Sequence, residues 1–191
     1  MNPKDATPKA ARIRSVVADA EPQLIGEVAK LGIGDPDAIA LWFGEGDMPT
    51  PQFICDAAHR SMLAGETFYS HKRGLPELRE ALAGYMSGVY AQPVEASRVT
   101  ITCSGMHGIL IAMQAVLEAG DNAVLIGPIW PNIYSTVEIN GGVSTHVSLS
   151  LRDDDWHLDM DELFAAVTDK TKAIFVNSPG NPTGWMLEPE Q

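Results

Sequence analysis

The feature that most constrains this chain is an alternation of short apolar strands with apolar helices, which begins near Arg98. A strand that is apolar on both faces has to be covered on both, and the order strand–helix–strand favours parallel pairing. The pattern therefore predicts an α/β fold with a mostly parallel sheet and helices on both faces. The predicted strands are Val99–Cys103, Ala123–Ile126, Gly142–Leu149 and Ala173–Asn177, and the predicted helices are His107–Ala119 and Asp161–Val167.

The first half of the chain is interrupted by glycine and proline and predicts separate helices. Proline at the start of a helical stretch and apolar residues at three- and four-residue spacing are typical of helix beginnings and helix faces. The expected elements are a helix near Pro22–Leu31, a short extended segment at Ile39–Phe43, a helix from Pro51 to about Ala64 and a helix that Gly74-Leu75-Pro76-Glu77 opens.

Charge and cysteine content exclude several classes of protein. Lys and Arg number 13 against 25 Asp and Glu, so the net charge is −12, which repels a nucleic-acid backbone. The two cysteines, Cys55 and Cys103, are too few for a disulfide framework. The charged first 20 residues contain no apolar signal-peptide core, and no apolar run reaches the ~18 residues of a membrane span. We therefore expect a protein that binds neither nucleic acid nor membranes. By elimination we expect it in the cytoplasm, with a eukaryotic organelle as the open alternative.

Metal sites are not expected. The five histidines are scattered without the spacing of metal ligands. The acidic run Asp153-Asp154-Asp155 lacks the further spaced ligands of a calcium site, so we expect it to be a solvated loop.

Three loops that follow predicted strands carry groups suited to a ligand. Ser104 and Gly105 stand between a strand and a helix, where main-chain N–H groups and the helix dipole favour a phosphate. Trp130 lies between two prolines, a setting that restricts an aromatic ring and suits contact with a planar ligand. Asn181 lies in a loop rich in proline and glycine and offers an amide donor and acceptor. Taken alone, each loop is better explained as a plain turn or as core packing, but loops after parallel strands converge at one sheet edge, and that convergence favours a site.

At these positions the chain resembles the fold-type I, pyridoxal-phosphate-dependent aminotransferases of class I and II. Asn177-Ser178-Pro179 followed by Asn181-Pro182-Thr183-Gly184 is similar to the family signature N-x-P-x-N-P-T-G. Gly44-Glu45-Gly46-Asp47 with Pro49-Thr50-Pro51 resembles its G-E-P-D-F-x-T-P. Tyr69, five residues before Gly74, matches Y-x-x-x-x-G-x-x-x-L-R together with Leu78-Arg79. The resemblance covers nearly the whole chain.

The resemblance implies a role for each matching position. Ser104, Gly105 and Met106 would hold the cofactor phosphate. The family frequently has a hydroxyl residue at the position of Met106, and because methionine has no hydroxyl, Met106 would bind the phosphate through its main-chain N–H. Trp130 would stack on the pyridine ring. Asn181 would bond to the phenolic oxygen of the cofactor and help to position the substrate carboxylate, near which Gly44 would offer its backbone. Tyr69 would contact the phosphate in the partner subunit, which implies a homodimer with shared active sites.

The resemblance also implies that the reaction needs residues outside this segment. The Schiff-base lysine, the aspartate beside the pyridine nitrogen and the arginine for the α-carboxylate follow N-P-T-G in the family, and none of the lysines here occupies that context. We expect the chain to continue beyond Gln191 and the 191-residue segment alone to be inactive. The expected organisation is an N-terminal arm, residues 1–43, that contributes to small-domain or dimer contacts, and residues 44–191 as the first part of the large cofactor-binding domain.

Two further interpretations stay open at this point. The same scaffold hosts β-lyases and decarboxylases, so the type of reaction is less constrained than the cofactor. A catalytically inactive aminotransferase-like module is the alternative from another class. The leading prediction is an enzyme of amino-acid metabolism that transfers an amino group between an amino acid and a 2-oxo acid. Which amino acid is the donor is not predicted.

Overall fold

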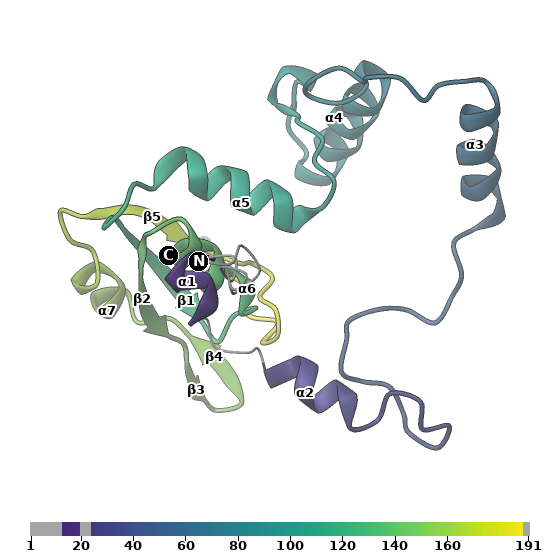
Figure 1. Cartoon of the computed structure of the whole chain (residues 1–191). Coiled ribbons are helices and arrows are strands. Elements are labelled where there is room, and N and C mark those ends of the chain that lie inside the picture. The colour runs from purple at the N-terminus through teal and green to yellow at the C-terminus, as the bar shows by residue number, and fades with distance from the viewer. Residues whose placement is uncertain (1–12, 20–23, 189–191) are drawn as a thin grey trace, which may run out of the picture. The chain divides into compact units, whose positions relative to one another are not determined.

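The computed structural model describes residues 13–19 and 24–188. The chain divides into two compact units. The sheet unit comprises Met1–Gln23 and Gly105–Gln191, and the helical unit comprises Leu24–Ser104 (Figure 1). The predicted division at residues 43 and 44 concerns the full-length protein and stays a prediction.

The sheet unit is built on three parallel strands. They are β1 (Asn122–Gly127), β2 (Val143–Ser148) and β5 (Thr171–Phe175), in the order β2-β1-β5. Both pairs of neighbours are parallel, with Gly127 opposite Ser148 and Leu125 opposite Phe175. All three strands were predicted. Because they run in the same direction, their carboxyl ends lie at one edge of the sheet.

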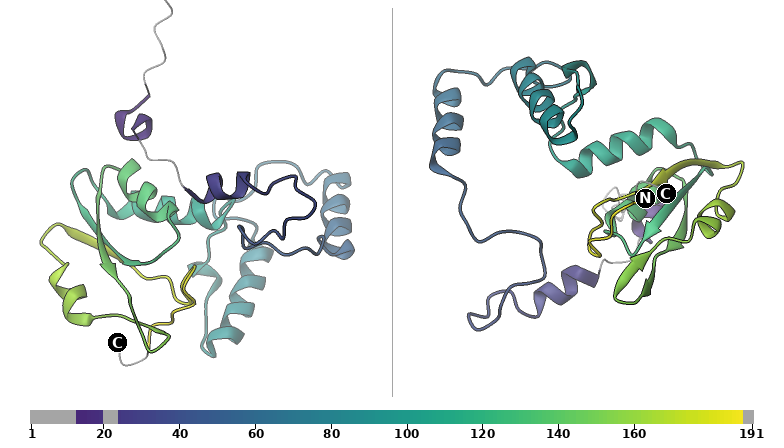
Figure 2. Two further views of the ribbon diagram at one scale, coloured as in Figure 1. Left: turned by 90° about the horizontal axis from the view of Figure 1, so that it is seen from below. Right: turned by 180° about the vertical axis from the view of Figure 1, so that it is seen from behind.

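Burial on both faces explains the uninterrupted apolar run Ala123–Ile126 in the central strand β1. All six of its residues are buried. Ala123 and Leu125 pack with α5 (Gly105–Val116) and α6 (Asn132–Ile139). Val124 and Ile126 point to the opposite face, where α7 (Met160–Ala165) contributes Leu163. Helices therefore cover both faces of the sheet, as predicted, and Figure 2 shows the strands between them.

A buried asparagine ties the three strands together at their amino ends. Asn122 is 7% exposed. Its Nδ2 donates to the carbonyl of Val143 at 3.0 Å and to the Thr145 hydroxyl at 2.7 Å. Its Oδ1 accepts from the Thr171 hydroxyl at 2.8 Å. A buried polar group whose bonds are all made gives the sheet one defined register.

The acidic run forms the exposed turn of a hairpin, so the solvated loop expected there is present at Asp153 and Asp154, between two strands that were not predicted. The strands β3 (Ser150–Arg152) and β4 (Asp155–His157) pair antiparallel. Asp153 and Asp154 form the turn between them with φ values of 50° and 65°. Aspartate tolerates this left-handed conformation, which matches the twist of a two-residue hairpin. Asp155 therefore begins a strand, and the adjacent Trp156 packs against the core on the α7 face of the sheet.

The helical unit contains α2 (Leu24–Lys30), α3 (Gln52–Leu63) and α4 (Pro76–Tyr90), followed by a 3-10 turn, η1 (Ala96–Arg98). A short helix of the sheet unit, α1 (Ser15–Ala18), was not predicted. The helices expected at Pro51–Ala64 and from Gly74 onward are confirmed. The helix expected near Pro22–Leu31 is confirmed over Leu24–Lys30, while Pro22 lies outside the described residues.

Two predicted extended segments are not strands. Ile39–Phe43 and Val99–Cys103 carry no strand in the structure. In the second segment, the carbonyl of Val99 accepts hydrogen bonds from arginine side chains, and the N–H of Ile101 donates to the carbonyl of Arg73. The segment is thus held by side chains and by one main-chain bond to a non-strand neighbour. Apolar content alone did not distinguish this arrangement from a sheet strand.

Candidate functional site

The candidate site of the sheet unit lies at the carboxyl edge of the parallel strands. The loop after β1 runs from Pro128 to Pro131 and enters α6, and the loop after β5 runs from Val176 to Gly184. β1 and β5 are neighbours, so these loops leave the sheet side by side. Edges of this kind, where parallel strands end, are the usual ligand sites of α/β sheets.

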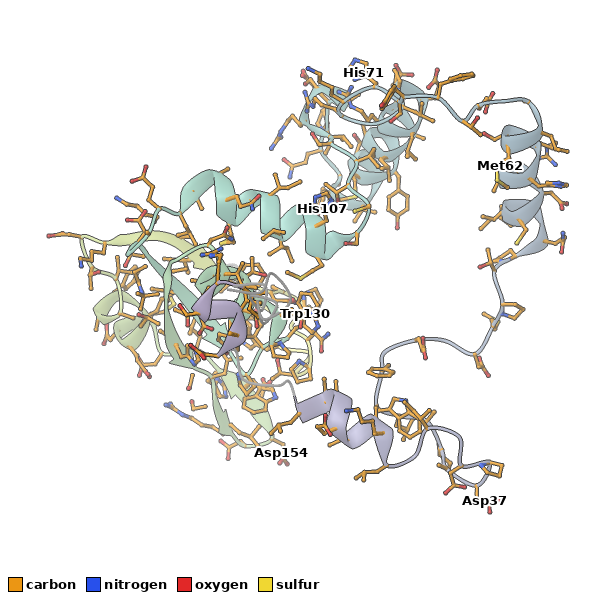
Figure 3. All side chains as sticks on the ribbon, viewed as in Figure 1. Asp37, Met62, His71, His107, Trp130 and Asp154 are labelled. Atoms are coloured by element: carbon orange, nitrogen blue, oxygen red, sulfur yellow. The ribbon has the colours of Figure 1, made fainter. Side chains whose placement is uncertain are left out.

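A main-chain hydrogen bond brings Trp130 and Asn181 together. The N–H of Trp130 donates to the carbonyl of Asn181 at 2.8 Å. Trp130 is half-buried, and Figure 3 labels its position. Asn181 is exposed, and its side-chain amide makes no hydrogen bond to the residues that the structure describes. Two residues that lie 51 positions apart in the sequence thus present an aromatic ring and an amide with unused donors and acceptor from adjacent loops.

The Asn181 loop is held in place by its own hydrogen bonds. Nδ2 of Asn177 donates to the carbonyl of Pro179 at 2.6 Å. The N–H of Gly180 donates to the carbonyl of Trp185 at 2.7 Å, and the N–H of Gly184 donates to the carbonyl of Gly180 at 2.7 Å. These bonds fix the loop on both sides of Asn181.

Trp185 anchors the same loop and was not singled out from the sequence. Its side chain is 7% exposed and packs in the core with Val147 and Leu163. The signal that was available is the type of residue, since a large aromatic directly after a tight turn commonly reaches the core.

The amino end of α5 faces the same edge. Met113 and Leu117 pack against β1, and a short turn joins the end of the helix to the start of that strand. The helix therefore runs back along the sheet with its first residues toward the carboxyl edge, and Figure 3 labels His107 in its first turn. Gly105 is the first helical residue, and a Cβ at this position would meet no atom within 4 Å. Open space next to the N–H groups of a helix start is the setting that suits an anion.

The remaining predicted site residues belong to the helical unit. Ser104 is its last residue and directly precedes Gly105. Gly44 lies in a loop with open space around its Cα. Tyr69 is fully exposed, and its side chain makes no hydrogen bond within the described part of the chain. The relation of Gly44 and Tyr69 to Trp130 and Asn181 stays a prediction.

The described lysines of the sheet unit are remote from this edge. Lys170 and Lys172 lie at the amino end of β5, and both are exposed. Between residues 13–19 and 24–188, no group of His, Cys, Asp and Glu could hold a metal ion. Among the helices described, none is both long and apolar enough to cross a membrane.

A pair of rings behind the β1 loop was also not foreseen. The rings of Tyr134 in α6 and His146 in β2 lie with their centroids 4.3 Å apart. Burial raises the pKa of the Tyr134 hydroxyl above its ordinary value of 10.0. Tyr134 thus remains protonated over the physiological range of pH, and its ring packs against the core that contains Ile129 and Ile133.

The comparisons with known proteins agree with this geometry. The family described as aminotransferase class I and II matches residues 36–191. A probable aspartate aminotransferase of Methanocaldococcus jannaschii is 30% identical over 178 residues, which are 93% of this chain and 46% of that protein. The structure of the aspartate aminotransferase from Thermus thermophilus with maleate has a TM-score of 0.83 and 31% identity, covering 95% of this chain and 48% of its own. The N-succinyldiaminopimelate aminotransferase from Mycobacterium tuberculosis has a TM-score of 0.85 and 26% identity, with 94% and 47% covered.

These matches show which part of the family fold this chain contains. The chain spans about half the length of the relatives that it matches, and the matched part includes the loops of Trp130 and Asn181. The family match, the solved structures and the parallel sheet with helices on both faces all indicate the fold-type I architecture. This chain belongs to the class I and II aminotransferase family and forms an N-terminal portion of its α/β fold.

Proposed function

We propose that the full-length protein is a pyridoxal-phosphate-dependent aminotransferase that moves an amino group between an amino acid and a 2-oxo acid. The observation that carries the proposal is the hydrogen bond from the Trp130 N–H to the Asn181 carbonyl. It supports a site in which a planar ligand lies against the indole while a polar substituent of the ligand meets the amide.

The residues present fit a phosphorylated pyridine. The open space at Gly105 and its place at the start of α5, where main-chain N–H groups point out of the helix, suit a phosphate. The half-buried face of Trp130 suits an aromatic ring, and the amide of Asn181 suits a phenolic oxygen. When bound, this cofactor supplies an electron-withdrawing ring that stabilises negative charge at the α-carbon of the substrate.

Each residue then has a definite task. Ser104, Gly105 and Met106 bind the phosphate, the last two through main-chain N–H groups. Trp130 orients the ring by stacking. Asn181 donates to the phenolic oxygen, which favours its anionic form, and contributes to binding of the substrate carboxylate. These tasks are binding and orientation. The group that transfers the proton is expected beyond Gln191.

The roles of Gly44 and Tyr69 extend the proposal to a homodimer. Gly44 offers a main-chain group to the substrate carboxylate, and its open surroundings are compatible with that role. Tyr69 reaches the phosphate of the partner subunit, and its full exposure within one chain supports an intersubunit contact. Cytoplasmic residence and a role in amino-acid metabolism are parts of the same proposal. The relatives act on different substrates by name, so the donor amino acid is left open.

The decisive experiment is a spectrum of the full-length protein. With added pyridoxal phosphate we expect a visible absorption band that borohydride reduction abolishes. Adding an amino acid should change the band, and a 2-oxo acid should restore it. A protein that stays colourless would contradict the proposal and favour an inactive aminotransferase-like module. A band that responds to an amino acid with release of CO₂ or of the β-substituent would instead indicate a decarboxylase or a β-lyase.

A further inference from the structure

A groove of about 630 Å³ lies between the end of α4 and the segment that follows this helix. α4 ends at Tyr90, and Ala91 reverses the chain with a φ of 50°. The N–H of Val94 donates to the Ser87 hydroxyl at 2.9 Å, which fastens the returning segment to the last turns of the helix. Arg79 of α4 holds the next part of the segment through bonds of 2.9 Å and 2.6 Å to two main-chain carbonyls. The groove is therefore formed by two pieces of chain that are fixed to each other.

The lining of the groove belongs to the helical unit alone, since all of it lies within residues 86–100. Its volume is in the range of ordinary small-molecule sites. Its apolar and aromatic lining consists of Met86, Tyr90, Pro93, Val94 and Val99. A ligand that covers these side chains removes apolar surface from water, which favours binding of an apolar body.

The polar lining carries hydrogen-bond donors and no carboxylate. It includes Gln92, Arg98 and Thr100. The guanidinium of Arg98 makes no hydrogen bond or ion pair to any described residue, and the side-chain amide of Gln92 likewise has no partner among them. The Thr100 hydroxyl accepts from Nε of Arg73 at 3.1 Å and keeps its own hydrogen for a further acceptor. The groove thus offers unused donors beside an apolar surface.

Positive charge gathers on this segment in a chain whose net charge is −12. Arg73 and Arg79 donate to its main-chain carbonyls, and within the described part of the chain neither they nor Arg98 form an ion pair. Between residues 81 and 104 the sequence has a single acid, Glu95. The carboxylate of Glu95 already accepts from a serine hydroxyl of the same segment at 3.0 Å. Three guanidiniums against one carboxylate attract an anion to this part of the chain.

We propose that the groove binds an organic carboxylate with an apolar body, and that Arg98 recognises the carboxylate. A guanidinium matches a carboxylate in charge and in its planar pair of donors. One guanidinium without an internal partner balances the single charge of a carboxylate, whereas a phosphate group carries nearly two charges. No residue of this lining has a role in the proposed cofactor and substrate site, so the inference does not depend on the proposed function.

The test uses phenylbutyrate as the probe and measures its dissociation constant by isothermal titration calorimetry with the full-length protein. Arg98→Met should weaken binding about three- to tenfold, because a charge-assisted bond is lost and the exposure of Arg98 limits the strength of that bond. The matched control is Arg60→Met in α3, which removes the same charge from the same unit. Arg60 lies outside the lining, and its side chain also has no partner among the described residues. This control should bind the probe as the wild type does.

Two further measurements separate the contribution of charge from that of apolar contact. Phenylbutanol has the same apolar body without the charge, so it should bind the wild type more weakly and should not distinguish the wild type from Arg98→Met. Met86→Ala removes apolar surface from the groove and should weaken phenylbutyrate about fourfold, the effect of about one buried methylene group. Thermal melting verifies that each variant folds. If Arg98→Met melts far below the wild type, Arg98→Gln replaces it and should weaken the probe to the same extent.

The outcomes decide between the proposal and its alternatives. Selective loss of affinity in Arg98→Met, with Arg60→Met unchanged, supports the carboxylate site. Equal affinity of Arg98→Met and wild type for phenylbutyrate overturns it, because the probe then binds elsewhere. It is also overturned if the wild type shows no saturable binding, if phenylbutanol binds as tightly as phenylbutyrate, or if phenyl phosphate binds more tightly. A full-length protein that stays colourless with pyridoxal phosphate contradicts the proposed function and leaves this inference intact.

Discussion

Replacing Asn181 with alanine should change the cofactor and leave the fold intact. The structure separates the two functions of this residue. Its main-chain carbonyl accepts from the Trp130 N–H, and this bond survives the substitution. Its side-chain amide has no partner among the described residues, so its loss should alter the free energy of unfolding by less than about 0.5 kcal/mol.

The effect on the cofactor follows from the charge that the amide contacts. If the amide of Asn181 donates to the phenolic oxygen, it stabilises the anionic, unprotonated form of the bound chromophore. A hydrogen bond to a charged group contributes about 1.5–3 kcal/mol, and one pKa unit corresponds to about 1.4 kcal/mol. Removing the amide should therefore raise the pKa of the chromophore by on the order of one unit. The measurement is a pH titration of the visible band in the full-length protein.

Asn177 provides the matched control, because it is the same residue type in the same loop. Its Nδ2 donates to the carbonyl of Pro179 at 2.6 Å. Asn177→Ala should thus lower the free energy of unfolding by about 0.5–1.5 kcal/mol and leave the pKa of the chromophore nearly unchanged. The reasoning is refuted if Asn181→Ala binds cofactor with an unshifted pKa, or if the two variants show the same pattern.

Three further predictions concern other parts of the chain. Gly74→Ala should lower the free energy of unfolding, measured by denaturant titration, by about 1–3 kcal/mol, because φ is +93° and the new Cβ would overlap with Ile101. The control is Gly84→Ala in the open interior of α4, which should raise the free energy of unfolding by up to about 1 kcal/mol. Tyr69→Phe should weaken cofactor binding, and mixed dimers with subunits that lack the Schiff-base lysine should regain activity at one site per dimer; no gain despite proven subunit exchange would show that Tyr69 does not act across subunits. Since burial raises the pKa of Tyr134, folding keeps its hydroxyl protonated, so its contribution to stability is present below pH 10.0 and lost as the pH rises through the folded value. Tyr134→Phe should reduce the alkaline loss of stability measured by thermal melting between neutral pH and pH values above 10.0.

Much of the sheet unit was predictable because the burial of each strand is encoded in the residues of that strand. Continuous apolar runs such as Ala123–Ile126 have few alternatives to a strand buried on both faces. Parallel pairing then brings the loops after these strands to one edge, which is why Trp130 and Asn181 could be expected together. The hydrogen bond between them was not predictable, since it depends on the conformations of both loops.

The errors arose where partners distant in the sequence decide the structure. Val99–Cys103 has the composition of a strand, but carbonyls in and just before it are bound by Arg73 and Arg79. The sequence of the segment itself does not indicate that Arg73 and Arg79 bind its carbonyls. The hairpin at Asp153 and Asp154 was missed for a different reason, because three consecutive acids were interpreted by their charge alone. Two of them in the left-handed conformation form a compact turn.

The structure also divides the family motifs into residues that shape the chain and residues left open for a ligand. The side chains of Asn177 and Arg79 are engaged by main-chain carbonyls, and Gly74 is required by its backbone conformation and by contact with Ile101. The amide of Asn181 makes no such bond to the described residues. A polar group that the fold does not use can interact with a ligand without first breaking an internal bond. Among the polar residues of one family motif, we therefore predict two kinds of effect. Removing a side chain that is hydrogen-bonded within the fold changes stability, whereas removing a side chain without such a bond changes the chemistry of the bound cofactor.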